Sequence, residues 1–156
     1  MKITKNRART IITKSGLPDS DYVINPYVGC SHGCIYCYAR FMKRFTGHSE
    51  PWGLFVDVKV NAPELIPSST DKYRGKSITL GSVCDPYQPA EKKYKLTRQI
   101  LEKLVPLQPE LCILIKSDLV LRDTDIIKQF KDCTVALSFS ILTKPLGRGW
   151  NPSHLQ

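Results

Sequence analysis

The chain has 156 residues, of which 42% are hydrophobic and 24% charged, a composition typical of one globular domain rather than of a disordered chain. No segment approaches the roughly 20 apolar residues that a membrane-spanning helix needs, so no membrane partner is expected. The net charge of +9, from 23 Lys and Arg against 14 Asp and Glu, favours anionic partners including nucleic acid, but it fits equally well a basic surface that only maintains solubility.

Residues 1–20 are predicted to form a basic N-terminal segment. The segment carries Lys2, Lys5, Arg7, Arg9 and Lys14 with no long apolar run behind them, which is unlike a secretion signal. We therefore expect a cytoplasmic protein. Its six cysteines are then expected to be reduced rather than paired in the disulfides of a secreted protein.

Residues 21–28 are predicted to form a strand that runs into a loop with three cysteines. Cys30, Cys34 and Cys37 have the spacing C-x3-C-x2-C, and Gly29 and Gly33 permit tight turns between them. This spacing can wrap three thiolates around three irons of a cubane cluster and leave the fourth iron without a protein ligand. An iron of that kind can bind and activate a small molecule.

Two tyrosines flank the third cysteine of this loop. Tyr36 and Tyr38 suit a site that must exclude water and pack a flat ring beside a metal, so a cofactor is predicted here. Structural zinc, held by the cysteines with His32 or His48, is an alternative. The paired knuckles that usually mark a zinc site are absent from the sequence.

The next segments are less regular. Residues 39–45 are predicted to open a helix rich in Arg40, Lys43 and Arg44. Residues 46–73 contain many Gly and Pro residues and are interpreted as a connecting excursion with one short strand at 54–60.

A repeated β-α order follows. Strands are predicted at 77–83, 111–115 and 134–141, and a helix is predicted at 91–105. Asp123 is expected to cap a second helix that carries Ile126, Ile127 and Phe130. This order predicts an α/β fold with a parallel sheet, whose ligand sites lie beyond the carboxyl ends of the strands.

The candidate site residues come at those strand ends, and their motifs resemble a known family. The pattern C-x3-C-x-aromatic-C resembles the signature of radical S-adenosylmethionine (radical SAM) enzymes. Three further motifs are similar to the subgroup related to spore photoproduct lyase, and the resemblance covers residues 22–141. They are Asn25-Pro-Tyr with Tyr36-Cys-Tyr-Ala-Arg40, Gly81-Ser-Val-Cys-Asp-Pro-Tyr-Gln-Pro-Ala-Glu91 with Lys95-Leu-Thr-Arg98, and Ile115-Lys-Ser-Asp-Leu-Val-Leu-Arg-Asp123.

The resemblance implies a fold and a division of the chain. Residues 21–141 would form the N-terminal part of a radical SAM core, a partial (β/α) barrel with about four of the family's six β-α units. Residues 142–156 are predicted to be an irregular tail. The last parallel strand would present an unpaired edge, which invites a partner.

The resemblance also implies the chemistry. A [4Fe-4S] cluster on Cys30, Cys34 and Cys37 would reductively cleave S-adenosylmethionine to a 5'-deoxyadenosyl radical, which abstracts hydrogen from an unidentified substrate. Ser82 and Asp85 would bind the amino end of the cosubstrate, Lys116 its carboxylate, Tyr36 the adenine side and Ser138, or Ser140, the ribose, with Tyr38 also beside the cofactor. An external electron donor of the flavodoxin or ferredoxin type is expected.

Alternatives remain open at this point. Photoproduct lyases carry a hydrogen-donating cysteine where this chain has Ser82, and Cys84 stands two residues later, so a DNA photoproduct repair reaction is one alternative rather than the main expectation. Others are a truncated, noncatalytic iron-sulfur fragment that needs another chain to complete the barrel, and a basic nucleic-acid-binding module with structural zinc. Cys112 and Cys133 are predicted to be core residues.

Overall fold

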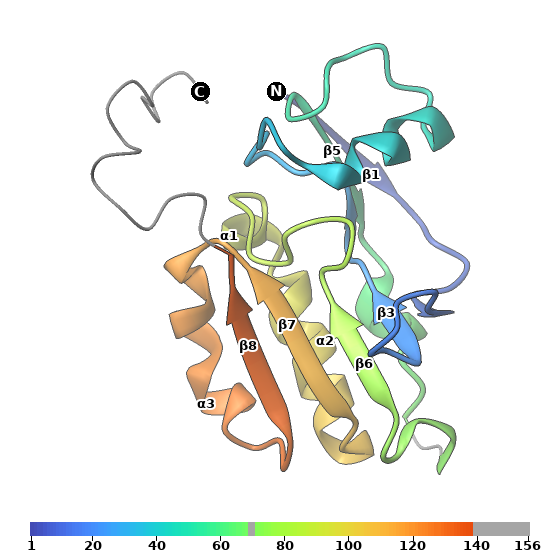
Figure 1. The fold of residues 1–156 in the computed structure, drawn as a ribbon, viewed down its shortest axis with the longest axis vertical. Coiled ribbons are helices and arrows are strands. Elements are labelled where there is room, and N and C mark those ends of the chain that lie inside the picture. Colours follow the sequence, from blue (N-terminus) through green and yellow to red (C-terminus); the bar gives the residue numbers. More distant parts are fainter. Residues whose placement is uncertain (69–70, 139–156) are drawn as a thin grey trace.

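The computed structural model describes residues 1–68 and 71–138. Within these residues the chain forms two sheets, one with strand order β1-β5-β4 and one with strand order β2-β3-β6-β7-β8 (Figure 1). The small sheet stands at one end of the larger one, next to the loop that carries the three cysteines. The described residues contain no helix that is both long and apolar enough to cross a membrane.

Four strands of the larger sheet run parallel, as the β-α order predicted. They are β3 (Tyr22–Ile24), β6 (Ser77–Leu80), β7 (Glu110–Ile115) and β8 (Cys133–Leu137), and β2 (Ile12–Lys14) lies antiparallel to β3. Their carboxyl ends therefore meet at one edge of the sheet. The assignment of this sheet to a partial radical SAM barrel stays a prediction.

The strands predicted at 77–83 and 111–115 are confirmed, although β6 ends at Leu80. The strand predicted at 134–141 is confirmed as far as Leu137, and its residues 139–141 lie outside the described residues, as do Ser140 and the predicted tail. Beside β8 the described residues place only β7, and Val135 and Leu137 on β8 are 39% and 46% exposed.

The single strand predicted at 21–28 is wrong. The chain instead forms β3 and then β4 (Tyr27–Val28), which belong to different sheets. Pro26 between them has no backbone N–H to offer a sheet, and it restricts the conformation of Asn25. The change of sheet carries the chain from the parallel strands to the cysteine loop.

The small sheet includes a strand that the sequence did not predict. β1 (Lys2–Asn6) pairs in parallel with β5 (Phe55–Lys59), and β4 pairs antiparallel with β5. β1 is mostly exposed, so it has no apolar pattern, and the same holds for β2 within the predicted basic segment. The strand expected at 54–60 is confirmed as β5, whose residues 55–58 are buried.

The helix predicted at 91–105 is broken in two. α1 (Glu91–Tyr94) and α2 (Leu96–Leu104) are separated by Lys95, whose backbone is left-handed with φ of 50°. Both carboxylate oxygens of Glu91 accept the Thr97 N–H at 3.1 Å, so a side chain from the first helix satisfies a free backbone donor at the start of the second.

The remaining helices are short. The segment predicted to open a helix at 39–45 is the 3-10 helix η1 (Tyr38–Phe45), and the helix expected after Asp123 is α3 (Thr124–Ile127). Asp123 stands at the capping position of α3, but its side chain makes no capping hydrogen bond. The other 3-10 turns are η2 (Ala62–Leu65), η3 (Asp71–Tyr73), η4 (Val105–Leu107) and η5 (Asp118–Asp123).

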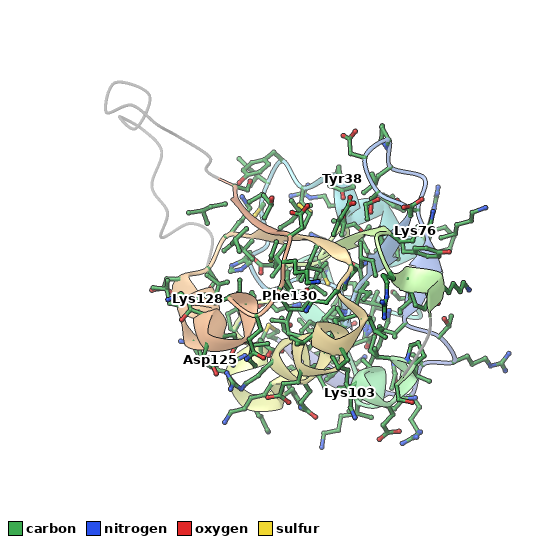
Figure 2. The ribbon with its side chains drawn as sticks, turned by 90° about the horizontal axis from the view of Figure 1, so that it is seen from below. Tyr38, Lys76, Lys103, Asp125, Lys128 and Phe130 are labelled. Atoms are coloured by element: carbon green, nitrogen blue, oxygen red, sulfur yellow. The ribbon has the colours of Figure 1, made fainter. Side chains whose placement is uncertain are left out.

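The main core lies between the larger sheet and α2, which runs behind β6 and β7 (Figure 1). Ile24, Leu80 and Ile113 face each other across β3, β6 and β7 and are fully buried. Each such side chain contributes about 1.5–3 kcal/mol by leaving water. Ile100, Leu101 and Leu104 of α2 are equally buried. Phe130 belongs to this core and lies toward the middle of the molecule seen from below, whereas Lys103 lies nearer its edge (Figure 2).

A buried ionic network joins the loop after β7 to the helices. Glu91 and Asp123 have side chains that are 0% exposed, and the Arg122 guanidinium donates to both, at 2.9 and 2.7 Å. Arg98 Nη1 also donates to Asp123 at 3.1 Å. Burial acts to raise the pKa of Asp123, but the hydrogen bonds from Arg122 and Arg98 outweigh it and hold that pKa below its usual value.

We expect Arg122→Met to lower the free energy of unfolding by about 3 kcal/mol at pH 7, because buried Glu91 loses the arginine it pairs with and buried Asp123 keeps only Arg98. The pKa of Asp123 is lowered, so its ionised form stabilises the folded wild type above the ordinary carboxyl range, and this stabilisation is lost as the pH falls. The gap between wild type and variant should therefore shrink below about pH 4. Urea unfolding of both proteins at pH 7 and below about pH 4 measures this difference in the free energy of unfolding.

Arg9→Met, the same substitution at an exposed arginine, is the matched control and should change the free energy of unfolding by less than about 0.5 kcal/mol. An equal loss in the two variants would contradict the role given to the network.

Candidate functional site

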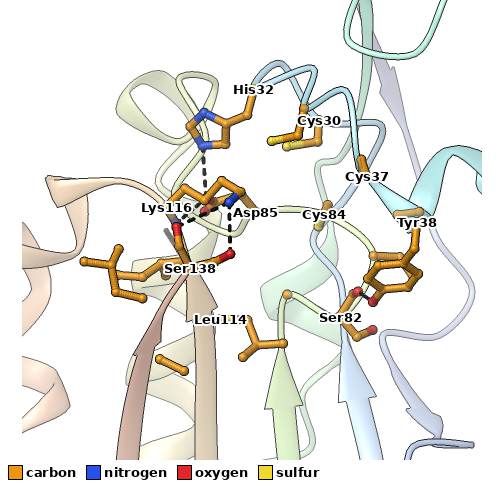
Figure 3. Close-up of a pocket in the computed structure, with 17 residues that line it drawn as sticks. Cys30, His32, Cys37, Tyr38, Ser82, Cys84, Asp85, Leu114, Lys116 and Ser138 are labelled. Atoms are coloured by element: carbon orange, nitrogen blue, oxygen red, sulfur yellow. Dashed lines mark hydrogen bonds and ion pairs between the residues drawn. The ribbon is translucent and has the colours of Figure 1, made fainter. Parts of the chain in front are cut away.

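A cavity of about 320 Å³ opens at the carboxyl ends of β6, β7 and β8. The cysteine loop forms its opposite wall (Figure 3). The volume is at the lower end of the roughly 300–1,000 Å³ typical of ligand pockets. Its lining includes most of the predicted site residues, namely Cys30, Cys34, Cys37, Tyr38, Ser82, Asp85, Lys116 and Ser138.

The three cysteines are free thiols in different surroundings. Cys30 is 8% exposed, and burial raises the pKa of its thiol to about 11. Cys34 and Cys37 are partly exposed. Within residues 1–68 and 71–138, no three His, Cys, Asp or Glu side chains are gathered in the arrangement of a bound metal ion. The three cysteines nevertheless line the same cavity.

The start of the loop needs glycine for a steric reason. Gly29 has φ of +83°, and a Cβ atom there would lie 2.4 Å from the Phe55 carbonyl oxygen. The cysteine loop is thus pressed directly onto β5 of the small sheet. This contact places Cys30 next to the buried interior rather than at the surface.

Asp85 joins the ends of two parallel strands. Its Oδ1 accepts the Tyr87 N–H at 2.7 Å and its Oδ2 accepts the Lys116 N–H at 2.8 Å. His32 Nε2 lies 3.0 Å from the same Oδ2, a contact that is an ion pair when the imidazole is protonated. The carboxylate therefore fixes the end of β7 against the loop after β6, and it lies in the cavity wall where an ammonium group was predicted to bind.

Three of the predicted residues meet at the end of β8. The Lys116 ammonium donates to Tyr36 Oη at 2.7 Å and to Ser138 Oγ at 2.9 Å. It also lies 5.1 Å from the centre of the Tyr36 ring. The structure thus brings together the groups that were assigned to the carboxylate, adenine and ribose of one cosubstrate.

The other predicted residues stand on the far side of the cavity. Tyr38 donates from its hydroxyl to the Ser82 carbonyl oxygen, and burial raises the pKa of that hydroxyl. Figure 3 shows Tyr38 and Ser82 facing Lys116 and Ser138 across the open space, with Cys30 above both pairs. The predicted residues therefore divide into two groups with a gap between them.

Two amide side chains organise the site, and the sequence reasoning gave neither of them a role. Asn25 Nδ2 donates to Ser82 Oγ at 2.9 Å, and Asn25 Oδ1 accepts the Val83 N–H at 2.9 Å. Gln88 Nε2 donates to the Gly29 carbonyl oxygen at 3.2 Å. Both amides directly precede a proline, a signal that could have marked them as fixed points of the backbone.

Cys84 lies in the cavity wall and is only 6% exposed. Its thiol donates to Asn25 Oδ1 at 3.6 Å, and burial raises its pKa far above the usual value. Lys59 donates to the Asn25 carbonyl oxygen at 2.7 Å, and burial lowers the pKa of its ammonium. Cys84 is therefore a buried side chain packed against Asn25 in the wall of the cavity.

Cys112, Cys133 and His48 do not line the cavity. Cys112 and Cys133, predicted to be core residues, are only partly buried on β7 and β8. His48, one candidate zinc ligand, is held by Asp57 at 2.9 Å and by Glu50 at 3.2 Å, and it stacks on Phe55. Of the two histidines considered for zinc, only His32 lines the cavity with the cysteines.

Comparison with known proteins finds relatives but no family model and no solved structure that matches. An uncharacterized protein of Methanocaldococcus jannaschii is 46% identical over 140 residues, which are 90% of this chain and 52% of that protein. An uncharacterized protein of Acidianus two-tailed virus is 35% identical over 130 residues, 78% of this chain and 42% of the relative.

A more distant similarity is to an uncharacterized protein of Mycobacterium tuberculosis, 33% identical over 112 residues, which are 69% of this chain and 33% of the relative. The chain spans about half the length of the archaeal relative and less of the other two.

We expect iodoacetamide at pH 8 to label Cys34 and Cys37 before Cys30 and Cys84. The raised pKa of Cys30, about 11, leaves a thiolate fraction about a hundredfold below that of an ordinary cysteine, and Cys84 is buried as well. Mass spectrometry of peptides from briefly treated native protein measures the order. Labelling in urea, where all six thiols are exposed, is the control. Early labelling of Cys84 would contradict the buried thiol.

Proposed function

We propose that this chain is a radical SAM iron-sulfur protein, which binds a [4Fe-4S] cluster and S-adenosylmethionine and acts on a substrate not yet identified. One observation carries the proposal. Three cysteines with C-x3-C-x2-C spacing form one wall of a cavity, and the ends of three parallel strands form the other. Parallel α/β sheets bind their ligands at this edge.

Cys30, Cys34 and Cys37 would hold the cluster, and the chemistry of this donor set supports the assignment. Three thiolates satisfy three irons and leave one open for a cosubstrate. When bound, the reduced cluster supplies the electron that cleaves the carbon-sulfur bond of S-adenosylmethionine and gives the 5'-deoxyadenosyl radical. The thiol of Cys30, whose pKa is raised to about 11, must lose its proton to become a ligand.

The strand-end residues bind and orient the cosubstrate. The Lys116 ammonium pairs with its carboxylate, and the Asp85 carboxylate pairs with its ammonium group. Tyr36 and Tyr38 provide aromatic surface near the adenine, and the hydroxyls of Ser82 and Ser138 provide hydrogen bonds to polar groups. Lys116 already contacts Tyr36 and Ser138, so one cation positions two of these residues.

The same site supports a second candidate function, which is cluster binding without autonomous catalysis. Two observations favour it. The chain spans 52% of the archaeal relative, and in the described part of the sheet β8 has a neighbour on one side only. A catalytic cavity would then be completed by a further chain segment or a partner beside β8.

We expect anaerobically reconstituted protein, given a strong reductant and S-adenosylmethionine, to release 5'-deoxyadenosine, measured by liquid chromatography. Cys34→Ala should abolish the release because it removes a cluster ligand. Cys112→Ala, the same substitution at a cysteine outside the cavity lining, should retain it. An assembled cluster without product supports the second candidate. Uptake of zinc in place of iron overturns both.

We expect Lys116→Met to weaken binding of S-adenosylmethionine to the reconstituted protein by about 10- to 100-fold, because a charge-assisted contact of about 1.5–3 kcal/mol is lost. Anaerobic equilibrium dialysis measures the affinity. Lys103→Met, on the exposed face of α2, is the matched control. Equal affinities in wild type and Lys116→Met would contradict the assigned role.

A further inference from the structure

The backbone on both sides of Cys30 is held by one buried side chain from another part of the chain. Gln88 is 0% exposed. Its Oε1 accepts the Ser31 N–H at 3.0 Å and lies 3.3 Å from Ser31 Oγ, while its Nε2 donates to the Gly29 carbonyl oxygen at 3.2 Å. The amide therefore bridges the two residues on either side of Cys30.

We propose that Gln88 is a positioning residue, which fixes the backbone around Cys30 and so sets the direction of its thiol toward the cavity. Both halves of the amide are used, one as donor and one as acceptor. A side chain of similar volume without an amide would fill the space, but the buried Gly29 carbonyl oxygen and the part-buried Ser31 N–H would lose these partners.

Gln88 can hold the loop because its own backbone is fixed. Its N–H donates to the Asp85 carbonyl oxygen at 3.3 Å, and its carbonyl oxygen accepts the Glu91 N–H at 2.8 Å. Asp85 in turn is fixed to the end of β7 through the Lys116 N–H. Gln88 is thus connected to the parallel sheet through Asp85, and its side-chain amide connects the cysteine loop to the same sheet.

Asn25 makes the reciprocal connection. It precedes the cysteine loop, and its amide holds Ser82 and Val83 in the loop after β6, whereas Gln88 follows that loop and holds the cysteine loop. Each loop is therefore fixed by a side chain that lies directly beside the other loop. The two walls of the cavity are locked in one relative position, which a site with ligands on both walls requires.

The cysteine loop would be less restrained without the hydrogen bonds from Gln88. Gly29 and Gly33 both have positive φ, and the backbone hydrogen bonds from Gly33 to Cys30 and from Cys37 to Cys34 are local to the loop. Local turns of this kind do not fix a loop relative to the sheet. The Gln88 contacts supply a long-range restraint, 57 residues apart in sequence for Ser31.

The first test needs no cofactor and uses the protein as purified. In Gln88→Met we expect the Ser31 amide to exchange with solvent deuterium at least about tenfold faster, because its buried acceptor is lost. Gln88→Glu keeps an acceptor and should restore most of the protection. Gln99→Met, at an exposed glutamine of α2, is the matched control and should leave Ser31 unchanged. Unchanged exchange in Gln88→Met overturns the proposal.

The second test rests on the proposed function. After anaerobic reconstitution with iron and sulfide, the reduced cluster of Gln88→Met should give an electron paramagnetic resonance spectrum that is shifted or broadened relative to wild type, whereas Gln99→Met should match wild type. Identical spectra in wild type and Gln88→Met overturn the positioning of a ligand.

The two failures are distinguishable. If wild type takes up no cluster, the proposed function fails, and amide exchange alone decides the role of Gln88. If Gln88→Met does not fold, as judged by near-ultraviolet circular dichroism, Gln88→Glu decides it. That variant loses the donor to the Gly29 carbonyl oxygen, so its spectrum should still differ from wild type.

Discussion

The parallel pairing of β3, β6, β7 and β8 is the constraint from which the rest of the site follows. In register, Ile24 faces Leu80 and Leu80 faces Ile113, so the carboxyl ends of the strands reach one edge together. Segments far apart in sequence, the cysteine loop, the turn at Asp85 and Lys116, then converge on one cavity. The fully buried side chains of these strands and of α2 hold the register, because slipping by one residue would turn apolar side chains toward solvent.

Behind that edge the protein buries carboxylates instead of avoiding them, and Asp85, Glu91 and Asp123 each have hydrogen-bond partners. The Asp85 carboxylate accepts backbone N–H groups from two segments, and the Glu91 carboxylate accepts one from the start of α2. Asp123 and Glu91 share the charge of Arg122. A buried polar group costs stability unless it is paired, so these contacts allow few other arrangements of the loops. The loops around the cavity are thus specified by hydrogen bonds, whereas the strands are specified by packing.

The sequence predicted the parts of the fold that carry a strong apolar period. β6 and β7 were predicted because each is a short run of mainly apolar residues with turns on both sides. β1 and β2 were missed because exposed edge strands have no such period. The break at Lys95 depends on the Glu91 side chain reaching the Thr97 N–H, a contact that periodicity does not report. The candidate site was foreseen through Cys30, Asp85 and Lys116, but Asn25 and Gln88 act through neighbours that only the folded chain brings close.

One edge of the larger sheet is occupied by the antiparallel strand β2, while β8 at the other edge has its described neighbour on one side only. A further parallel strand could therefore be added to this sheet at the β8 edge. A strand added beside β8 could continue the parallel order without disturbing the strands already paired, and Val135 and Leu137 offer it apolar surface. Such a strand would change the cavity on its β8 side and leave the opposite wall unaltered, because the cysteine loop packs against β5 of the small sheet.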